Sequence, residues 1–209
     1  MKNNFDINVL SGNLLPVMET FQTIQGEGYF KGSSAYFIRI GGCDVGCHWC
    51  DIKESWDYNN YNFQNVYDIV NSINSKSKIV VITGGEPLMW NMSPLTKILN
   101  KKDFKTHLET SGAYPVTGNW DWICLSPKKN KKPCTDSFKI ANELKVIIYN
   151  KSDFEFAEQM SREVSLECKL FLQPEWSNRE KMMPLIVDFI TKNDKWRVSL
   201  QTHKYMNIP

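Results

Sequence analysis

Ile79-Val80-Val81-Ile82-Thr83-Gly84-Gly85-Glu86-Pro87 is a run of mostly β-branched apolar residues that ends directly in a glycine-rich turn. An unbroken apolar run of this kind is typical of a strand buried on both faces, as in the middle of a parallel sheet. Adjacent glycines let a backbone approach a ligand closely, and the following glutamate can accept a hydrogen bond from an ammonium group. An ordinary turn has the same composition, so this stretch alone predicts a central strand and a candidate ligand loop.

The same pattern continues on both sides of this strand. Similar apolar runs predict strands at 35–40, 106–109, 122–125, 144–148, 170–173 and 197–200, and helical spacing predicts helices around 66–73, 95–99, 156–160 and 183–190. Alternating strands and helices indicate an α/β fold with a parallel sheet and right-handed crossovers. The connections after Glu109 and Leu125 are too short for full helices, so we expect an incomplete TIM-like barrel. No repeat or flexible linker interrupts the chain, which predicts a single domain over residues 1–209.

Polar residues follow the strand ends, where the loops of parallel α/β folds converge on one site. The most informative is Cys43-Asp44-Val45-Gly46-Cys47-His48-Trp49-Cys50, a CxxxCxxC motif after the first predicted parallel strand. Three thiolates on one loop can hold three corners of a [4Fe–4S] cluster and leave one iron open. Structural zinc and a cluster used only for electron transfer remain alternatives, although both normally take four protein ligands.

CxxxCxxC followed by a glycine-rich loop resembles the radical S-adenosylmethionine (SAM) superfamily. Further segments across nearly the whole chain resemble its 7-carboxy-7-deazaguanine synthase family, which makes a precursor of queuosine and other deazapurines. These segments are 21–28 (FQTIQGEG), 37–39 (FIR), 50–51 (CD), 109–112 (ETSG), 125–128 (LSPK), 173–175 (QPE) and 201–205 (QTHKY). The resemblance implies a lyase that uses a SAM-derived radical to convert 6-carboxy-5,6,7,8-tetrahydropterin to 7-carboxy-7-deazaguanine and ammonia. The rivals are an activase that places a glycyl radical on a partner protein, and an electron carrier that does not bind SAM.

The resemblance also implies residue roles. The cluster ligands are Cys43, Cys47 and Cys50; the residues that contact SAM are Trp49, Gly85, Ser126, Pro127, Lys128, Gln173, Pro174, Glu175 and Trp176; those that contact substrate are Ile24, Gln25, Gly26, Arg39, Thr83 and Pro209 through its terminal carboxylate. Arginine suits a substrate carboxylate because its guanidinium forms bidentate pairs. The radical chemistry belongs to the cofactor, and no side chain is assigned as catalytic.

One position departs from the family pattern. The residue two places after the last cluster cysteine is typically Ser or Thr, whose hydroxyl binds magnesium, but here it is Ile52. Because magnesium prefers oxygen ligands and keeps several waters, we still expect a magnesium cofactor, held by water, the substrate carboxylate or a nearby backbone carbonyl and not by the side chain of position 52. Asp51 is a candidate compensating carboxylate.

Bulk properties bound the remaining expectations. Lys and Arg number 25 against 23 Asp and Glu, so the overall charge gives no support for nucleic-acid binding. No apolar run is long enough to span a membrane and the start lacks the apolar segment of a signal peptide, which predicts a cytoplasmic protein. The resemblance adds a homodimer and a flavodoxin-like or ferredoxin reductant.

Several other cysteine, lysine and histidine residues could suggest function, but most of them are expected to have structural roles. Isolated Cys124, Cys134 and Cys168 are expected to be structural. The basic run at 128–132 is expected to be a solvated loop, with a flavodoxin docking site as the alternative. His107 is expected to pack or face solvent, whereas for His203 the sequence leaves pocket lining open.

Overall fold

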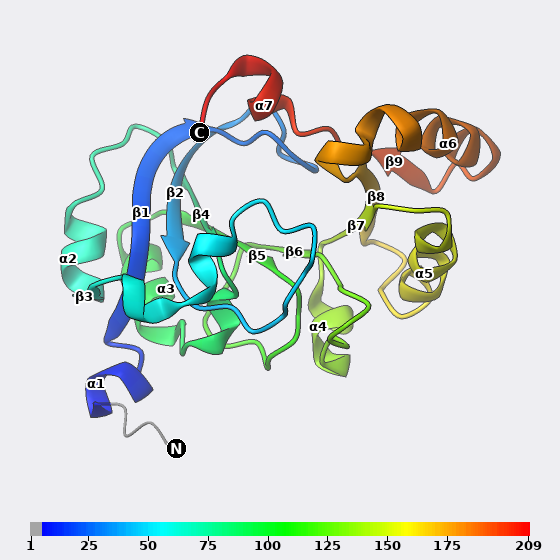
Figure 1. Ribbon diagram of the computed structural model, residues 1–209. Coiled ribbons are helices and arrows are strands. Elements are labelled where there is room, and N and C mark those ends of the chain that lie inside the picture. The colour runs from blue at the N-terminus through cyan, green and yellow to red at the C-terminus, as the bar shows by residue number, and fades with distance from the viewer. Residues whose placement is uncertain (1–5) are drawn as a thin grey trace.

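The computed structural model describes residues 6–209, in which nine strands form one sheet (Figure 1). The strand order is β3-β1-β2-β4-β5-β6-β7-β8-β9. From β2 to β9 neighbouring strands are parallel, whereas β1 is antiparallel to both β2 and β3. Strands β3 and β9 are the two edges of the sheet, so the structure is an unclosed barrel, as the sequence predicted.

The strands are β1 (Leu14–Ile24), β2 (Ser34–Ile40), β3 (Phe63–Asn65), β4 (Ile79–Gly84), β5 (Lys105–Thr110), β6 (Trp122–Leu125), β7 (Glu143–Ile148), β8 (Lys169–Pro174) and β9 (Trp196–Val198). Each predicted strand is present, although β9 ends two residues before the expected position. The search for continuous apolar runs did not predict β1 or β3. Strand β1 contains polar residues such as Glu19 and Gln22 because its second half is only partly buried, so it has no continuous apolar run.

The helices are α1 (Ile7–Leu10), α2 (Val66–Asn71), α3 (Ser93–Lys101), α4 (Thr135–Ile140), α5 (Ser152–Ser161), α6 (Arg179–Lys192) and α7 (Thr202–Met206). The predicted helices correspond to α2, α3, α5 and α6. Helices α1 and α7 are too short to show a helical period, and α4, although as long as α2, has only Phe138 as a buried apolar residue. No α-helix joins β5 to β6, and α4 has only six residues, which confirms that neither connection holds a full-length helix.

Two apolar cores hold the helices against the sheet. One packs α2 and α3 on β1, β2 and β4, and the other packs α4, α5 and α6 on β7, β8 and β9. Val80, Val81 and Ile82 of β4 are fully buried, but only Val80 and Ile82 belong to the first core, because successive side chains of a strand point to opposite faces. Burying an aliphatic side chain of this size contributes about 1.5–3 kcal/mol.

The C-terminal segment returns to the beginning of the chain. Helix α7 lies near the end of β1 and the start of β2 in Figure 1, and Thr23 Oγ1 donates to a main-chain oxygen of Pro209 at 3.3 Å. The loop between β1 and β2 and the end of the chain therefore meet above the open side of the barrel. Over residues 6–209, no helix combines the length and the apolar character needed to cross a membrane.

Candidate active site

Residues at the carboxyl ends of the parallel strands line one cavity of about 590 Å³. Apart from Pro127, every residue that the sequence assigned to iron, SAM or substrate lines this cavity. They are Cys43, Cys47, Cys50, Trp49, Gly85, Ser126, Lys128, Gln173, Pro174, Glu175, Trp176, Ile24, Gln25, Gly26, Arg39, Thr83 and Pro209. The fold thus brings segments from residue 24 to residue 209 to one place, which their spacing along the chain does not show.

The thiols of Cys43, Cys47 and Cys50 are free of disulfides and partly buried. The Cys50 amide donates to the Cys47 carbonyl at 3.1 Å and closes the turn that carries these two thiols. Burial raises the pKa of Cys43 to about 11, and it also raises the pKa of Cys47. Iron binding must therefore displace a proton from each of these two thiols.

The cysteine loop is fixed by contacts with other segments. The Cys43 amide donates to the Trp56 carbonyl at 3.1 Å. The Asp44 carboxylate accepts from Lys131 Nζ at 2.6 Å and from Tyr114 Oη at 2.6 Å. Within residues 6–209, no three His, Cys, Asp or Glu side chains are grouped so that they could all bind one metal ion. Three thiols on a supported loop, each able to bind a different iron atom, fit a [4Fe–4S] cluster with one open corner.

Gly85 brings the glycine-rich loop against the cysteine loop. A Cβ atom at Gly85 would collide with the Gly42 carbonyl and would lie 3.2 Å from the Cys43 Cβ, so only glycine fits. The Gly85 amide donates to the Ile40 carbonyl at 2.8 Å, and the Glu86 amide donates to the Gly42 carbonyl at 2.8 Å. The two motifs that suggested the superfamily are therefore in direct backbone contact.

Glu86 is 1% exposed and its carboxylate is satisfied by the protein itself. Oε1 accepts from Thr110 Oγ1 at 2.5 Å and from the Leu88 amide at 3.1 Å, while Oε2 accepts from the Ser111 amide at 2.8 Å and hydroxyl at 2.5 Å. These bonds use the roughly four acceptor positions of a carboxylate. Glu86 thus joins the end of β4 to the end of β5, which corrects the sequence-based idea that it accepts from a ligand's ammonium group.

Three of the residues assigned to SAM lie together beside the cysteines. Lys128 Nζ donates to Ser126 Oγ at 2.7 Å and to the Ser126 carbonyl, and it lies 5.7 Å from the centre of the Trp49 ring. Burial lowers the pKa of Lys128, while the nearby Cys47 thiol opposes that shift. The lysine therefore places a cation next to one of the sulfur ligands.

The end of β8 presents backbone and one aromatic ring to the cavity. The Glu175 carboxylate accepts from the Ser177 amide at 3.0 Å and hydroxyl at 2.5 Å, so it caps the short helix that begins at Trp176. The Trp176 ring lies 4.3 Å from the Arg179 guanidinium carbon and 5.0 Å from Lys204 Nζ. These cations hold the ring in place. The Glu175 side chain is used structurally, and its main-chain amide donates to the Ile148 carbonyl at 3.0 Å.

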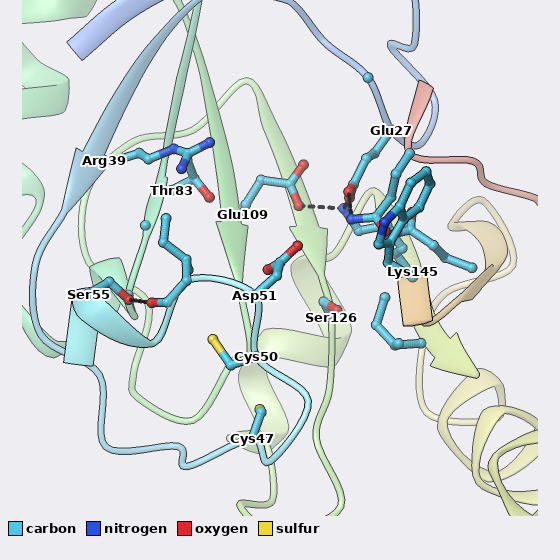
Figure 2. A pocket seen from close by; sticks show the side chains of 18 of the residues that line it. Glu27, Arg39, Cys47, Cys50, Asp51, Ser55, Thr83, Glu109, Ser126 and Lys145 are labelled. Carbon is cyan, nitrogen blue, oxygen red and sulfur yellow. Dashed lines mark hydrogen bonds and ion pairs between the residues drawn. The ribbon is translucent and has the colours of Figure 1, made fainter. Parts of the chain in front are cut away.

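Arg39 and Thr83 lie side by side on β2 and β4. The parallel register pairs these two residues, and Figure 2 shows them together at one end of the pocket, away from Cys47 and Cys50. Arg39 Nη1 is 3.2 Å from Glu19 Oε1, and its guanidinium lies 5.1 Å from the centre of the Phe21 ring. Because a guanidinium carries five N–H donors in a fixed plane, Glu19 and Phe21 orient the group while using only part of its donor capacity.

His203 and the β1–β2 loop close over one another. The Thr202 amide and hydroxyl each donate to the Gly26 carbonyl at 2.9 Å. A Cβ atom at Gly26 would collide with the His203 imidazole, so glycine allows the close approach. His203 lines the cavity, and burial lowers its pKa, with Glu27 opposing the shift.

Sequence reasoning gave no role to a buried charged group on the cavity wall. Lys145 Nζ lies 2.6 Å from Glu27 Oε2 and 2.8 Å from Glu109 Oε2 (Figure 2). Both glutamates stand inside motifs that carried the family resemblance. The signal for Lys145 was a single lysine in the apolar strand 144–148, at a position whose side chain points to the inner face.

Position 52 does not fit a magnesium ion held by a side chain. Ile52 has no side-chain oxygen, and its carbonyl already accepts from the Ser55 amide at 3.0 Å and hydroxyl at 2.7 Å. The Asp51 carboxylate, the candidate replacement, is 2.6 Å from Lys204 Nζ. Ile52 thus offers no side-chain ligand, and the Asp51 carboxylate is already paired with a lysine.

The remaining conspicuous residues have structural partners. Cys124 and Cys168 are buried, and Cys134 is partly buried. His107 is 6% exposed, and its ring centre is 4.5 Å from that of Phe30, so it packs in the interior. In the basic run, Lys129 is 2.5 Å from Asp153 and Lys131 is paired with Asp44, so two of its charges are neutralised by acidic neighbours.

An unclosed parallel barrel that presents CxxxCxxC and a glycine-rich loop to one cavity defines a class, the radical SAM enzymes, and residues 37–123 match that superfamily. Proteins named 7-carboxy-7-deazaguanine synthase are 57% identical in Flavobacterium psychrophilum, over the full length of both chains, and 49% identical in Synechocystis, over 92% of this chain and 93% of the relative. This chain belongs to the 7-carboxy-7-deazaguanine synthase family.

The structural comparison agrees with the sequences. The crystal structure of QueE from Escherichia coli matches with a TM-score of 0.83 and 30% identity, covering 91% of this chain and 96% of the other. The Escherichia coli K12 protein named 7-carboxy-7-deazaguanine synthase is 33% identical over 92% of this chain and 98% of its own. Family membership identifies an enzyme, which sets aside a simple electron carrier, and it separates the chain from the glycyl-radical activases.

Proposed function

We propose that this chain converts 6-carboxy-5,6,7,8-tetrahydropterin to 7-carboxy-7-deazaguanine with loss of ammonia. The observation that carries the proposal is a single cavity lined by the three cluster cysteines at one end and by Arg39 and Thr83 at the other. Its volume of about 590 Å³ lies within the range of small-molecule sites. The family name of the relatives supplies the reaction product.

The chain's own residues would bind and orient the substrate. Arg39 would pair with the pterin carboxylate, because a guanidinium matches a carboxylate with two parallel hydrogen bonds. The main-chain amide of Gly26, next to Gln25, would read the edge of the pterin ring, and Thr83 would contact it beside Arg39. Fixing the substrate in this way converts binding energy into orientation of the reacting carbon.

Cys43, Cys47 and Cys50 would hold the [4Fe–4S] cluster, and Trp49, Gly85, Ser126, Lys128 and residues 173–176 would surround SAM. When both are bound, they supply one-electron chemistry that removes and returns one hydrogen atom of the substrate. The Lys128 ammonium would stabilise the negative charge near Cys47. We include no magnesium step, because Ile52 has no side-chain oxygen and the Asp51 carboxylate is paired with Lys204. A homodimer and a flavodoxin-like or ferredoxin electron donor are further proposals, supported by the family pattern.

The test uses the whole chain with its cluster reconstituted under anaerobic conditions. Dithionite, SAM and 6-carboxy-5,6,7,8-tetrahydropterin are added, and the product is followed by its deazaguanine absorbance and mass. We expect ring-contracted product from the native chain and none from Cys47→Ala. Native protein that holds a four-iron cluster and cleaves SAM but forms no deazaguanine would overturn the proposal.

A further inference from the structure

Lys145 forms a buried ion trio that joins distant parts of the chain. Its side chain is 5% exposed, whereas those of Glu27 and Glu109 are 18% and 21% exposed. Glu27 lies on the β1–β2 loop, Glu109 near the end of β5, and Lys145 in the middle of β7. The two carboxylates reach Lys145 from sites 118 and 36 residues away in the sequence.

Each carboxylate of the trio also holds a neighbour in the cavity wall. Glu27 Oε1 accepts from Gln201 Nε2 at 2.9 Å, which links the trio to the segment before α7. Glu109 Oε1 accepts from Gln25 Nε2 at 3.4 Å. Lys145 thus stands at the centre of a network that includes Gln25, a predicted substrate contact, and the C-terminal segment that carries His203 and Pro209.

The backbone of the β1–β2 loop depends on this network. The Gln25 side chain accepts from the Glu27 amide at 3.1 Å, and the Gly28 amide donates to Ser199 Oγ at 2.9 Å. Main-chain bonds fix the first half of the loop: the Gln25 amide donates to the Ser33 carbonyl at 2.8 Å, and the Gly26 carbonyl accepts from Thr202. No backbone bond to another strand holds Glu27, so its ion pair with Lys145 and the neighbouring Gly28–Ser199 bond fasten this part of the loop.

The charges of the trio support one another. Burial alone would raise the pKa of Glu27, but Lys145 lowers it to about 2. Burial alone would lower the pKa of Lys145, but the acidic groups around it, Cys124, Glu109, Glu27 and Glu143, raise it well above its usual value. Removing the ammonium would leave two carboxylates of like charge on the same wall, and a buried charge without its partner is strongly unfavourable.

We propose that Lys145 is a positioning residue of the reaction: its buried ammonium holds the Glu109 carboxylate in the cavity and fastens the 25–28 loop beside the substrate through Glu27. Lys145 acts through these two carboxylates and not on the reacting atoms. The effect on turnover rests on the proposed function, whereas the fastening of the loop does not.

The main test compares Lys145→Met with Lys105→Met in the reconstituted enzyme. Lys105 pairs with Asp121 at 2.9 Å on the exterior, with a side chain 65% exposed, and is remote from the cavity lining. For Lys145→Met we expect the KM for the carboxypterin to rise about 10- to 100-fold, the range for lost hydrogen bonds to charged groups. SAM cleavage without substrate should persist, because the cluster residues are unchanged. Lys105→Met should behave as the native enzyme.

The pH profile separates positioning from a purely structural role. Without Lys145 the two neighbouring carboxylates bind protons more readily, so the acid limb of kcat/KM should move to higher pH by about one unit or more. In Lys145→Met/Glu27→Gln, Glu109 no longer faces Glu27 but still lies near Glu143, so the limb should move part of the way back. Lys145→Arg keeps the cation and should retain the native limb.

Hydrogen–deuterium exchange tests the loop without turnover. Exchange at residues 25–29 should accelerate in Lys145→Met and in Glu27→Gln, but not in Lys105→Met. If Lys145→Met fails to fold, Glu27→Gln still decides the point through the same exchange and KM measurements. Native KM, pH limb and loop exchange in these variants would overturn the proposal. If the native chain makes no deazaguanine, the proposed function fails, while the exchange rates still test the fastening of the loop.

Discussion

Replacing Glu86 with Gln tests whether this buried carboxylate supports the glycine-rich loop. The carboxylate accepts four hydrogen bonds, two from the Leu88 and Ser111 amides and two from the Thr110 and Ser111 hydroxyls. An amide has one oxygen and one NH2 group. The hydroxyls can rotate to accept from the NH2 group, but one main-chain N–H must lose its acceptor.

The expected loss in the free energy of unfolding follows from the number of hydrogen bonds that the amide cannot replace. One orphaned buried N–H costs about 1–3 kcal/mol, and loss of the charge weakens the two bonds that the amide oxygen still accepts by about 1 kcal/mol each. The total is about 3–5 kcal/mol in the free energy of unfolding. With a urea slope of about 2 kcal/mol/M, the unfolding midpoint should fall by about 1.5–2.5 M. Because Gly85 adjoins Glu86, affinity for SAM should fall as well.

The assay is anaerobic urea unfolding of the reconstituted protein, followed by tryptophan fluorescence and cluster absorbance. Glu180→Gln is the matched control, because Glu180 has a side chain 89% exposed and makes only one long ion pair, 3.5 Å to Arg179. A change below about 1 kcal/mol in Glu86→Gln, with native SAM affinity, would refute the reasoning that four inward hydrogen bonds fix the loop.

Three other perturbations test separate parts of the structure. Arg39→Lys should raise the KM for the carboxypterin about 10- to 100-fold because the bidentate pair is lost; steady-state kinetics that match those of the exposed control Arg162→Lys would contradict this role. Burial lowers the pKa of His107 to about 4 from 6.5, so the folded state binds fewer protons than the unfolded chain and stability should fall as pH drops from 6.5 to 4, by about 3 kcal/mol. His107→Leu should remove that slope in unfolding measurements, and an unchanged slope would point to other groups. Native turnover should be insensitive to a magnesium chelator, whereas Ile52→Thr should gain manganese binding visible by electron paramagnetic resonance; magnesium-dependent native turnover would show that main chain, water or substrate holds the ion.

The central strands and the cysteine loop were predictable because their signals are local. Each buried parallel strand is an apolar run, as in 79–83 or 144–148, and needs no knowledge of its neighbours. Strand β1 was not predicted because it is only partly buried and so lacks a continuous apolar run. Its hydrogen-bonded pairing with β2 stabilises it as a strand. Helices α1 and α7 were missed because four or five residues cannot show a helical period. Helix α4 is as long as α2, but it buries only Ser137 and Phe138, whereas α2 carries several apolar residues at helical spacing.

The sequence by itself determined the class of chemistry, through Cys43, Cys47, Cys50 and the glycine-rich loop, since ligand type and spacing within a short loop limit what can bind. The tertiary structure alone decided that Glu86 bonds inward and that Lys145 joins Glu27 to Glu109. Such contacts link residues far apart in the chain, and a charged side chain is placed by which partners surround it once water is excluded. No local pattern records those partners.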